Sequence, residues 1–174
     1  KTSIPMSLIS AAGKTAEELS VRGAKFEKLH RGGWEPHARI KDQNTDGIAA
    51  EIIYPSVGME ICNIPDVDLK QACMEAYNRW LVEFCAPYPH RLIGLGQCAV
   101  RSPADGIKEL EAIKQAGFKG VMLPGLPAQE DYAHEMYEEF FDAVVDLELV
   151  PSFHILTSGE GLRQNFRGSK INGF

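Results

Sequence analysis

His154 is the residue whose type and position most directly suggest chemistry. It lies in the segment ELVPSFHILTSGEG (148–161), at the end of an apolar run that predicts a buried strand, and Gly159 and Gly161 follow it. A neutral imidazole in such a position is a good ligand for zinc and other divalent metals. The alternative is a strand histidine whose ring nitrogens are satisfied by neighbouring polar groups. From these residues alone, metal ligand and packed strand residue both remain open for His154.

The other histidines and the cysteines show no spacing typical of a metal or redox site. No HxH or HExxH pair occurs, and the remaining histidines are expected at the surface: His30, His37, His90 and His134. No CxxC pair occurs among the four cysteines, Cys62, Cys73, Cys85 and Cys98. We expect these cysteines to be ordinary reduced thiols of a cytoplasmic protein.

Three earlier apolar runs also end in residues that are suited to shape a substrate pocket. These candidate substrate-binding residues are Tyr54 and Ser56 after the first run, Gln97 in the second, and Leu123, Pro124 and Gly125 at the end of the third. Residues at strand ends and in the loops that follow them often determine specificity. For Tyr54 the alternative is a packed ring whose hydroxyl is satisfied within the protein.

Alternating strands and helices are predicted to hold these residues in place. Short apolar runs predict strands near 49–55, 92–99, 119–123 and 151–155, and apolar periodicity predicts helices over 36–48, 66–88, 102–117 and 134–149. The third helix has local boundary residues, with Ser102 as N-cap, Pro103 in its first turn and Gly117 after its end. Helices alternating with continuous apolar strands indicate parallel βαβ units covered on both faces.

Two architectures fit parallel βα units, an open doubly wound sheet and a closed (β/α)₈ barrel. An open nucleotide-binding sheet is usually marked by a glycine-rich loop, and neither GxGxxG nor GxxxxGK[ST] occurs here. The barrel is therefore favoured. In barrels the carboxyl ends of the strands carry the active site, which is where His154 is expected.

The chain resembles amidohydrolase-related enzymes of the branch related to aminocarboxymuconate-semialdehyde decarboxylase. RGGWEPHARIKDQNTDGIAAEIIYPSVG is similar to the segment of that family leading through barrel strand 2, and AYNRWLVEFCAPYPHRLIGLGQCAV to its next helix and strand 3. GIKELEAIKQAGFKGVMLPG is similar to the following helix and strand 4, and LELVPSFHI to strand 5. The likeness runs in order from about Gly32 to about Gly159.

The resemblance implies a (β/α)₈ barrel around a divalent metal, most often zinc. Its ligands would be a His-x-His pair on strand 1, a histidine on strand 5 and an aspartate on strand 8. A further histidine after strand 6 usually acts as the acid or base. Only the strand 5 histidine has a counterpart in this chain, and that counterpart is His154.

Length and charge limit the remaining possibilities. A complete barrel needs roughly 250 residues, so we expect the 174-residue chain to be a single, incomplete barrel domain (1–174) with four or five βα units. The chain also begins with lysine, and we expect it to lack its natural start. The net charge of −6 argues against nucleic-acid binding, and no apolar run is long enough to span a membrane.

Two classes of function remain open. The first is a metal-dependent hydrolase or non-oxidative decarboxylase that acts on a small organic acid or carbonyl compound, with zinc or another divalent ion as cofactor. The second is a non-catalytic or regulatory α/β protein of the same ancestry without a complete metal site. We expect a full-length enzyme that is a homo-oligomer, most simply a dimer, and no activity from these 174 residues alone.

Overall fold

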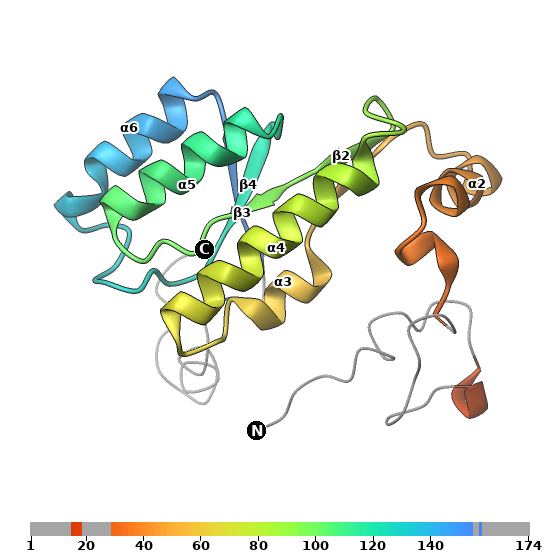
Figure 1. Cartoon of the computed structure of the whole chain (residues 1–174), viewed down its shortest axis with the longest axis horizontal. Helices are drawn as coiled ribbons and strands as arrows, with labels where there is room; N and C mark the ends of the chain where they lie inside the picture. Colours follow the sequence, from red (N-terminus) through yellow and green to blue (C-terminus); the bar gives the residue numbers. More distant parts are fainter. Residues whose placement is uncertain (1–14, 19–28, 155–156, 158–174) are drawn as a thin grey trace. The chain divides into compact units, whose positions relative to one another are not determined.

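The computed structural model describes residues 15–18, 29–154 and 157 (Figure 1). The strands are β1 (Glu51–Ile53), β2 (Leu92–Gly94), β3 (Gly96–Gln97), β4 (Gly120–Leu123) and β5 (Val150–Phe153). The α-helices are α2 (Pro36–Asp46), α3 (Ser56–Ile61), α4 (Val67–Cys85), α5 (Pro103–Gln115) and α6 (Glu138–Asp146). Short 3₁₀ turns cover Ala16–Glu18, Arg31–Gly33 and Glu135–Tyr137. Within these described ranges, no helix has the length and apolar character required to cross a membrane.

The strands pair in the order that the βα units predict. β1 pairs with β2, and β3, β4 and β5 form a second sheet in that order with both pairings parallel. The predicted strand 92–99 is divided at Leu95, whose N–H donates to the Ile53 carbonyl at 3.2 Å. Its first part thus pairs with β1 and its second part with β4.

The described residues fall into two compact units. One contains the described residues up to Ile52 together with Glu83–Ile93, and the other contains Ile53–Val82 and the described residues from Gly94 onward. The division passes through the β1–β2 pair and near the end of α4. The single domain expected from the sequence remains a prediction.

In the larger unit, α5 and α6 lie side by side (Figure 1). Ser102 caps α5 by accepting the Asp105 N–H at 3.1 Å, and Gly117 follows the helix with φ of 91°, so both predicted boundaries are confirmed. A Cβ atom on Gly106 would lie 2.7 Å from Cε2 of Phe140. Glycine at this position therefore permits the close approach of the two helices.

The two faces of the parallel sheet are distinguished by the register. Gly96 is paired with Val121, and a Cβ atom on Gly96 would meet Ile113 of α5 at 2.9 Å, so this row faces the helix. The adjacent row of Gln97, Met122 and Ser152 lies on the opposite face, since successive strand residues alternate. This second face carries the candidate site.

Two details of local structure differ from the prediction. The short helix α3, which begins at Ser56 after β1, was not predicted, because this apolar run with its Pro55 and Gly58 resembles a strand followed by strand breakers. The strands were also expected to be covered on both faces, which holds for β4 but not for β5. Val150 and Phe153 of β5 are 64% and 53% exposed, because within the described residues β5 is an edge strand that pairs only with β4.

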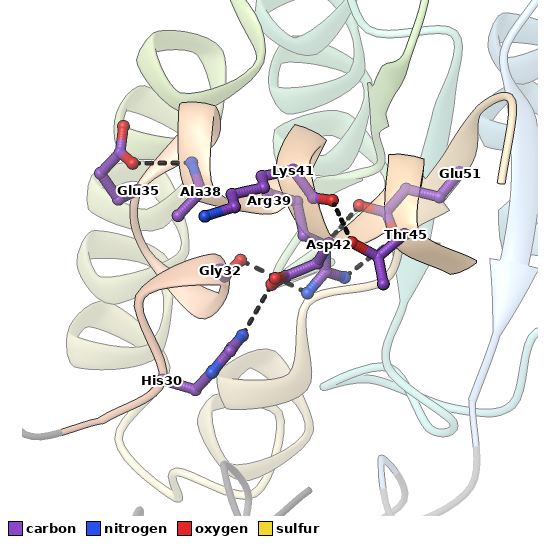
Figure 2. Close-up of polar contacts among 9 residues, drawn as sticks. All are labelled: His30, Gly32, Glu35, Ala38, Arg39, Lys41, Asp42, Thr45 and Glu51. Carbon is purple, nitrogen blue, oxygen red and sulfur yellow. Dashed lines mark hydrogen bonds and ion pairs between the residues drawn. The ribbon is translucent and has the colours of Figure 1, made fainter. Parts of the chain in front are cut away.

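In the smaller unit, polar contacts join the 3₁₀ turn, α2 and β1 (Figure 2). Glu35 caps α2 by accepting the N–H groups of His37 and Ala38 at 3.0 and 2.7 Å. Arg39 donates through Nε and Nη2 to both carboxylate oxygens of Glu51, at 2.5 and 3.0 Å, and through Nη1 to the Gly32 carbonyl at 3.4 Å. This two-pronged ion pair connects α2 to the start of β1.

Replacing Arg39 with lysine is expected to lower the free energy of unfolding by about 1 kcal/mol, because a lysine ammonium cannot bind both carboxylate oxygens in the geometry of a guanidinium. The Glu51 side chain is only 19% exposed, so solvent weakens this pair less than it weakens a surface pair. Urea denaturation would measure the loss. Arg79→Lys, at an exposed position on α4, is the matched control, and equal stability of the two variants would contradict the prediction.

Candidate active site

His154 comes directly after β5, and its ring lies beside Tyr54. The two ring centroids are 5.7 Å apart with the planes tilted by 53°, and His154 is half-buried. The Thr157 hydroxyl donates to the backbone carbonyl of His154 at 2.6 Å and holds the chain where it leaves the strand. Two predicted site residues, Tyr54 and His154, are thus brought together.

Ser152 joins this pair, although it was not among the predicted site residues. The Tyr54 hydroxyl donates to Ser152 Oγ at 3.2 Å. Ser152 lies on the face of the sheet that points away from α5, two residues before His154, and alternation places His154 on the same side. This two-residue spacing from His154 is the feature of the sequence by which Ser152 could have been found.

Gln97 lies on the same face of the sheet, in β3, but its side chain is fully buried. It is 1% exposed, and a Cβ atom on Gly58 of α3 would overlap its Nε2 atom. Neither polar atom of its carboxamide has a hydrogen-bond partner within the described part of the chain. Buried polar atoms are ordinarily hydrogen-bonded, so the Gln97 carboxamide is an unfavourable group on this face of the sheet.

The predicted residues at the end of β4 do not all reach this face. Leu123 is fully buried on the face opposite to Met122, so the structure does not bring its side chain to the group around His154. The Pro124 carbonyl accepts the Tyr132 hydroxyl at 3.1 Å, and the Gly125 N–H donates to the Thr157 carbonyl at 3.1 Å. These two bonds join the end of β4 to the loop before α6 and to the chain that follows His154.

Tyr132 is a second residue near these strand ends that was not predicted from the sequence. Its ring packs in an aromatic cluster with Tyr137, Phe140, Phe141 and Phe153, at centroid distances of 5.3 to 6.5 Å. Burial among these rings disfavours the charged phenolate and raises the pKa of Tyr132 far above its ordinary value. Tyr132 therefore stays protonated and keeps donating to Pro124. Aromatic residues of α6 and β5 thereby hold the end of β4.

The described residues supply only part of a metal site. No group of three or more histidine, cysteine, aspartate or glutamate side chains that could hold an ion occurs within residues 15–18, 29–154 and 157. The imidazole of His154 is a suitable single donor, since its position at a strand end and its half-buried ring are compatible with coordination. A complete site would need further ligands.

Residues 29–167 match the sequence model of a family described as amidohydrolase. This match covers the described strands β1 to β5 and the helices between them.

Solved structures of similar fold include enzymes that release carbon dioxide. 5-Carboxyvanillate decarboxylase from Novosphingobium aromaticivorans, complexed with manganese and 4-hydroxy-3-methoxy-5-nitrobenzoic acid, is 25% identical, with a TM-score of 0.61 over 75% of this chain and 39% of that chain. 2,6-Dihydroxybenzoate decarboxylase from Rhizobium is 23% identical, with a TM-score of 0.58 over 67% of this chain and 38% of that chain. An amidohydrolase from Mycobacterium avium subsp. paratuberculosis is 19% identical, with a TM-score of 0.66 over 81% of this chain and 39% of that chain.

These likenesses confirm the predicted fold class, since parallel βα units match part of a (β/α)₈ barrel. The chain spans 38% to 39% of the length of the three structures.

Proposed function

This chain belongs to the amidohydrolase family, and we propose that the whole protein is a metal-dependent enzyme that removes carbon dioxide from a small organic acid without an oxidant. An aromatic acid is the substrate class that we favour. The similarity to 5-carboxyvanillate decarboxylase, at 25% identity, supports decarboxylation in particular. Hydrolysis of a small acid derivative by the same protein is the second possibility, because the family likeness also includes a structure described as an amidohydrolase.

The observation that carries this proposal is the placement of His154 at the carboxyl end of β5, with Tyr54 and Ser152 beside it. We assign His154 the role of one metal ligand. For the substrate-binding wall we propose the residues at the neighbouring strand ends: Tyr54, Ser56, Gln97, Leu123, Pro124 and Gly125. For Leu123 the backbone, rather than the buried side chain, is the part available for such a role.

Tyr54 and Ser152 together suggest how an acid is oriented. Tyr54 uses its proton in the bond to Ser152 Oγ, so the Ser152 hydroxyl keeps its own proton to donate. In this arrangement the phenol oxygen of Tyr54 can accept a hydrogen bond from a substrate, and the Ser152 hydroxyl can donate one to it. A carboxylate oxygen of the substrate would bind the serine proton, and a substrate hydroxyl would bind the tyrosine oxygen.

A bound divalent ion would supply electrostatic stabilisation of the negative charge that develops on substrate oxygens when the bond to the carboxylate breaks. Manganese is supported by the 5-carboxyvanillate decarboxylase complex, and zinc by the suitability of an imidazole donor.

We also infer a cytoplasmic location, which the four free thiols support. We further infer a homodimer, which size-exclusion chromatography with light scattering would test.

Carbon dioxide release is the direct test of this function. The full-length protein, loaded in turn with manganese and with zinc, is incubated with hydroxybenzoic acids and, in parallel, with their amides and esters. We expect release of carbon dioxide from at least one acid and loss of that activity when a chelator removes the metal. The 174-residue chain alone should be inactive. Turnover of the amides or esters alone would favour a hydrolase, and no turnover with either metal would favour the non-catalytic alternative.

A further inference from the structure

The backbone segment Gln97–Val100, which begins at the last residue of β3, is held by side chains from two helices. The Asn78 carboxamide of α4 makes two bonds to the backbone of Gln97: its Nδ2 donates to the Gln97 carbonyl, and its Oδ1 accepts the Gln97 N–H, each at 2.8 Å. A carboxamide has the same donor and acceptor as a peptide group, and here it pairs with β3 as a neighbouring strand would. β3 has only β4 as a strand neighbour among the described residues.

A second side chain, that of Glu109, binds the backbone of Ala99, two residues after Gln97. Oε2 of Glu109, on α5, accepts the Ala99 N–H at 2.6 Å. Its Oε1 atom is buried and has no hydrogen-bond partner within the described residues. Burial raises the pKa of Glu109, and the bond from Ala99 opposes that rise. Burial of a carboxyl group is costly unless the group is hydrogen-bonded, and the Ala99 N–H supplies such a bond.

The backbone between these anchors and α5 has an unfavourable conformation. Val100 has φ of 49°, in the left-handed region that β-branched residues rarely adopt, and its side chain is fully buried. The Val100 carbonyl accepts the Ala128 N–H at 3.2 Å. Such a conformation persists only where the surroundings hold it in place. Asn78 and Glu109 supply that restraint on the side of β3.

We infer that Asn78 and Glu109 are positioning residues: they hold the fully buried Gln97–Val100 segment in place and thereby fix Gln97, one of the residues proposed for the substrate-binding wall. The effect on substrate binding rests on the proposed function. The hydrogen bonds from Asn78 and Glu109 to this segment, here called the clamp, rest on the structure alone. Neither residue needs to touch the substrate. Because Gln97 belongs to the proposed substrate-binding wall and His154 follows another strand, loss of these hydrogen bonds should weaken substrate binding and leave the metal in place.

The test uses the full-length protein with Asn78→Ala, Glu109→Ala and Glu109→Gln, and Gln71→Ala as an α4 control away from the Gln97–Val100 segment. Hydrogen exchange of individual amides should quicken by about tenfold or more at Gln97 in Asn78→Ala and at Ala99 in Glu109→Ala, while the Val121 amide of β4 exchanges as in the wild type. KM for the acid should rise by about tenfold, with kcat within about twofold and metal content unchanged. Glu109→Gln retains an acceptor and should restore both the protection of Ala99 and the KM.

Three results would overturn the inference. One is unchanged exchange at Gln97 and Ala99, another is faster exchange at all three amides equally, and the third is an unchanged KM despite loss of local protection. A wild-type protein that neither binds nor turns over any acid would refute the proposed function. The exchange data would then still uphold or reject the clamp by themselves.

Discussion

Alanine in place of His154 is expected to remove bound metal and turnover from the full-length protein together. Loss of a residue that only orients a ligand already lowers metal affinity or activity by about 10- to 100-fold, so loss of a ligand should lower both by about 100-fold or more. Elemental analysis of the purified protein and an assay of carbon dioxide release would measure the two effects in the same sample.

The control for this prediction is His90→Ala, at an exposed position outside the proposed site. It should retain metal and activity. The Thr157 hydroxyl binds the backbone carbonyl of His154, so removal of the ring leaves that bond intact, and the fold should survive the substitution. Full metal content with normal turnover in His154→Ala would show that this histidine is a packed residue of the strand end.

The largest loss of stability is expected from Phe140→Ala. Phe140 is fully buried on α6, packs against Gly106 of α5, and contacts the rings of Tyr137 and Phe141 at 6.1 and 5.3 Å. Truncation removes apolar contacts and leaves a cavity between two helices, which costs about 3–5 kcal/mol at buried phenylalanines. Urea denaturation followed by circular dichroism would give the change in the free energy of unfolding.

Val145→Ala provides the comparison on the same helix. Val145 is 73% exposed, so its truncation should change the free energy of unfolding by less than about 0.5 kcal/mol. A loss at Phe140 no larger than the loss at Val145 would mean that the interface between α5 and α6 does not contribute to the stability of the protein.

Much of the fold was predictable because it depends on local rules. The N-cap at Ser102 and the glycine after α5 act within a few residues of the helix ends. Continuous apolar runs indicate strands that are buried on both faces, as in a parallel sheet. A helix between two successive strands indicates that those strands run parallel. α3 was missed because its six residues make fewer than two helical turns, too few for a 3.6-residue periodicity to be recognised, and Pro55 before it and Gly58 within it resemble strand breakers.

The candidate site was predictable only in part. His154 could be placed at a strand end from the sequence, because strand boundaries and the order of the βα units are local features. Leu123 was also placed in the pocket, but which face of β4 it occupies depends on the register with β3 and β5. A shift of one residue in register moves each side chain to the other face.

The sequence by itself determined the class of fold, the family likeness and one candidate metal ligand. Only the tertiary structure decided which partners meet, because their bonds join residues that lie far apart along the chain. Tyr54 and Ser152 are 98 residues apart, and Asn78 and Gln97 are 19 residues apart. No periodic pattern encodes such pairs. They form because α4 and the strand ends are brought together by burial of apolar side chains, and the polar contacts are a consequence of that packing.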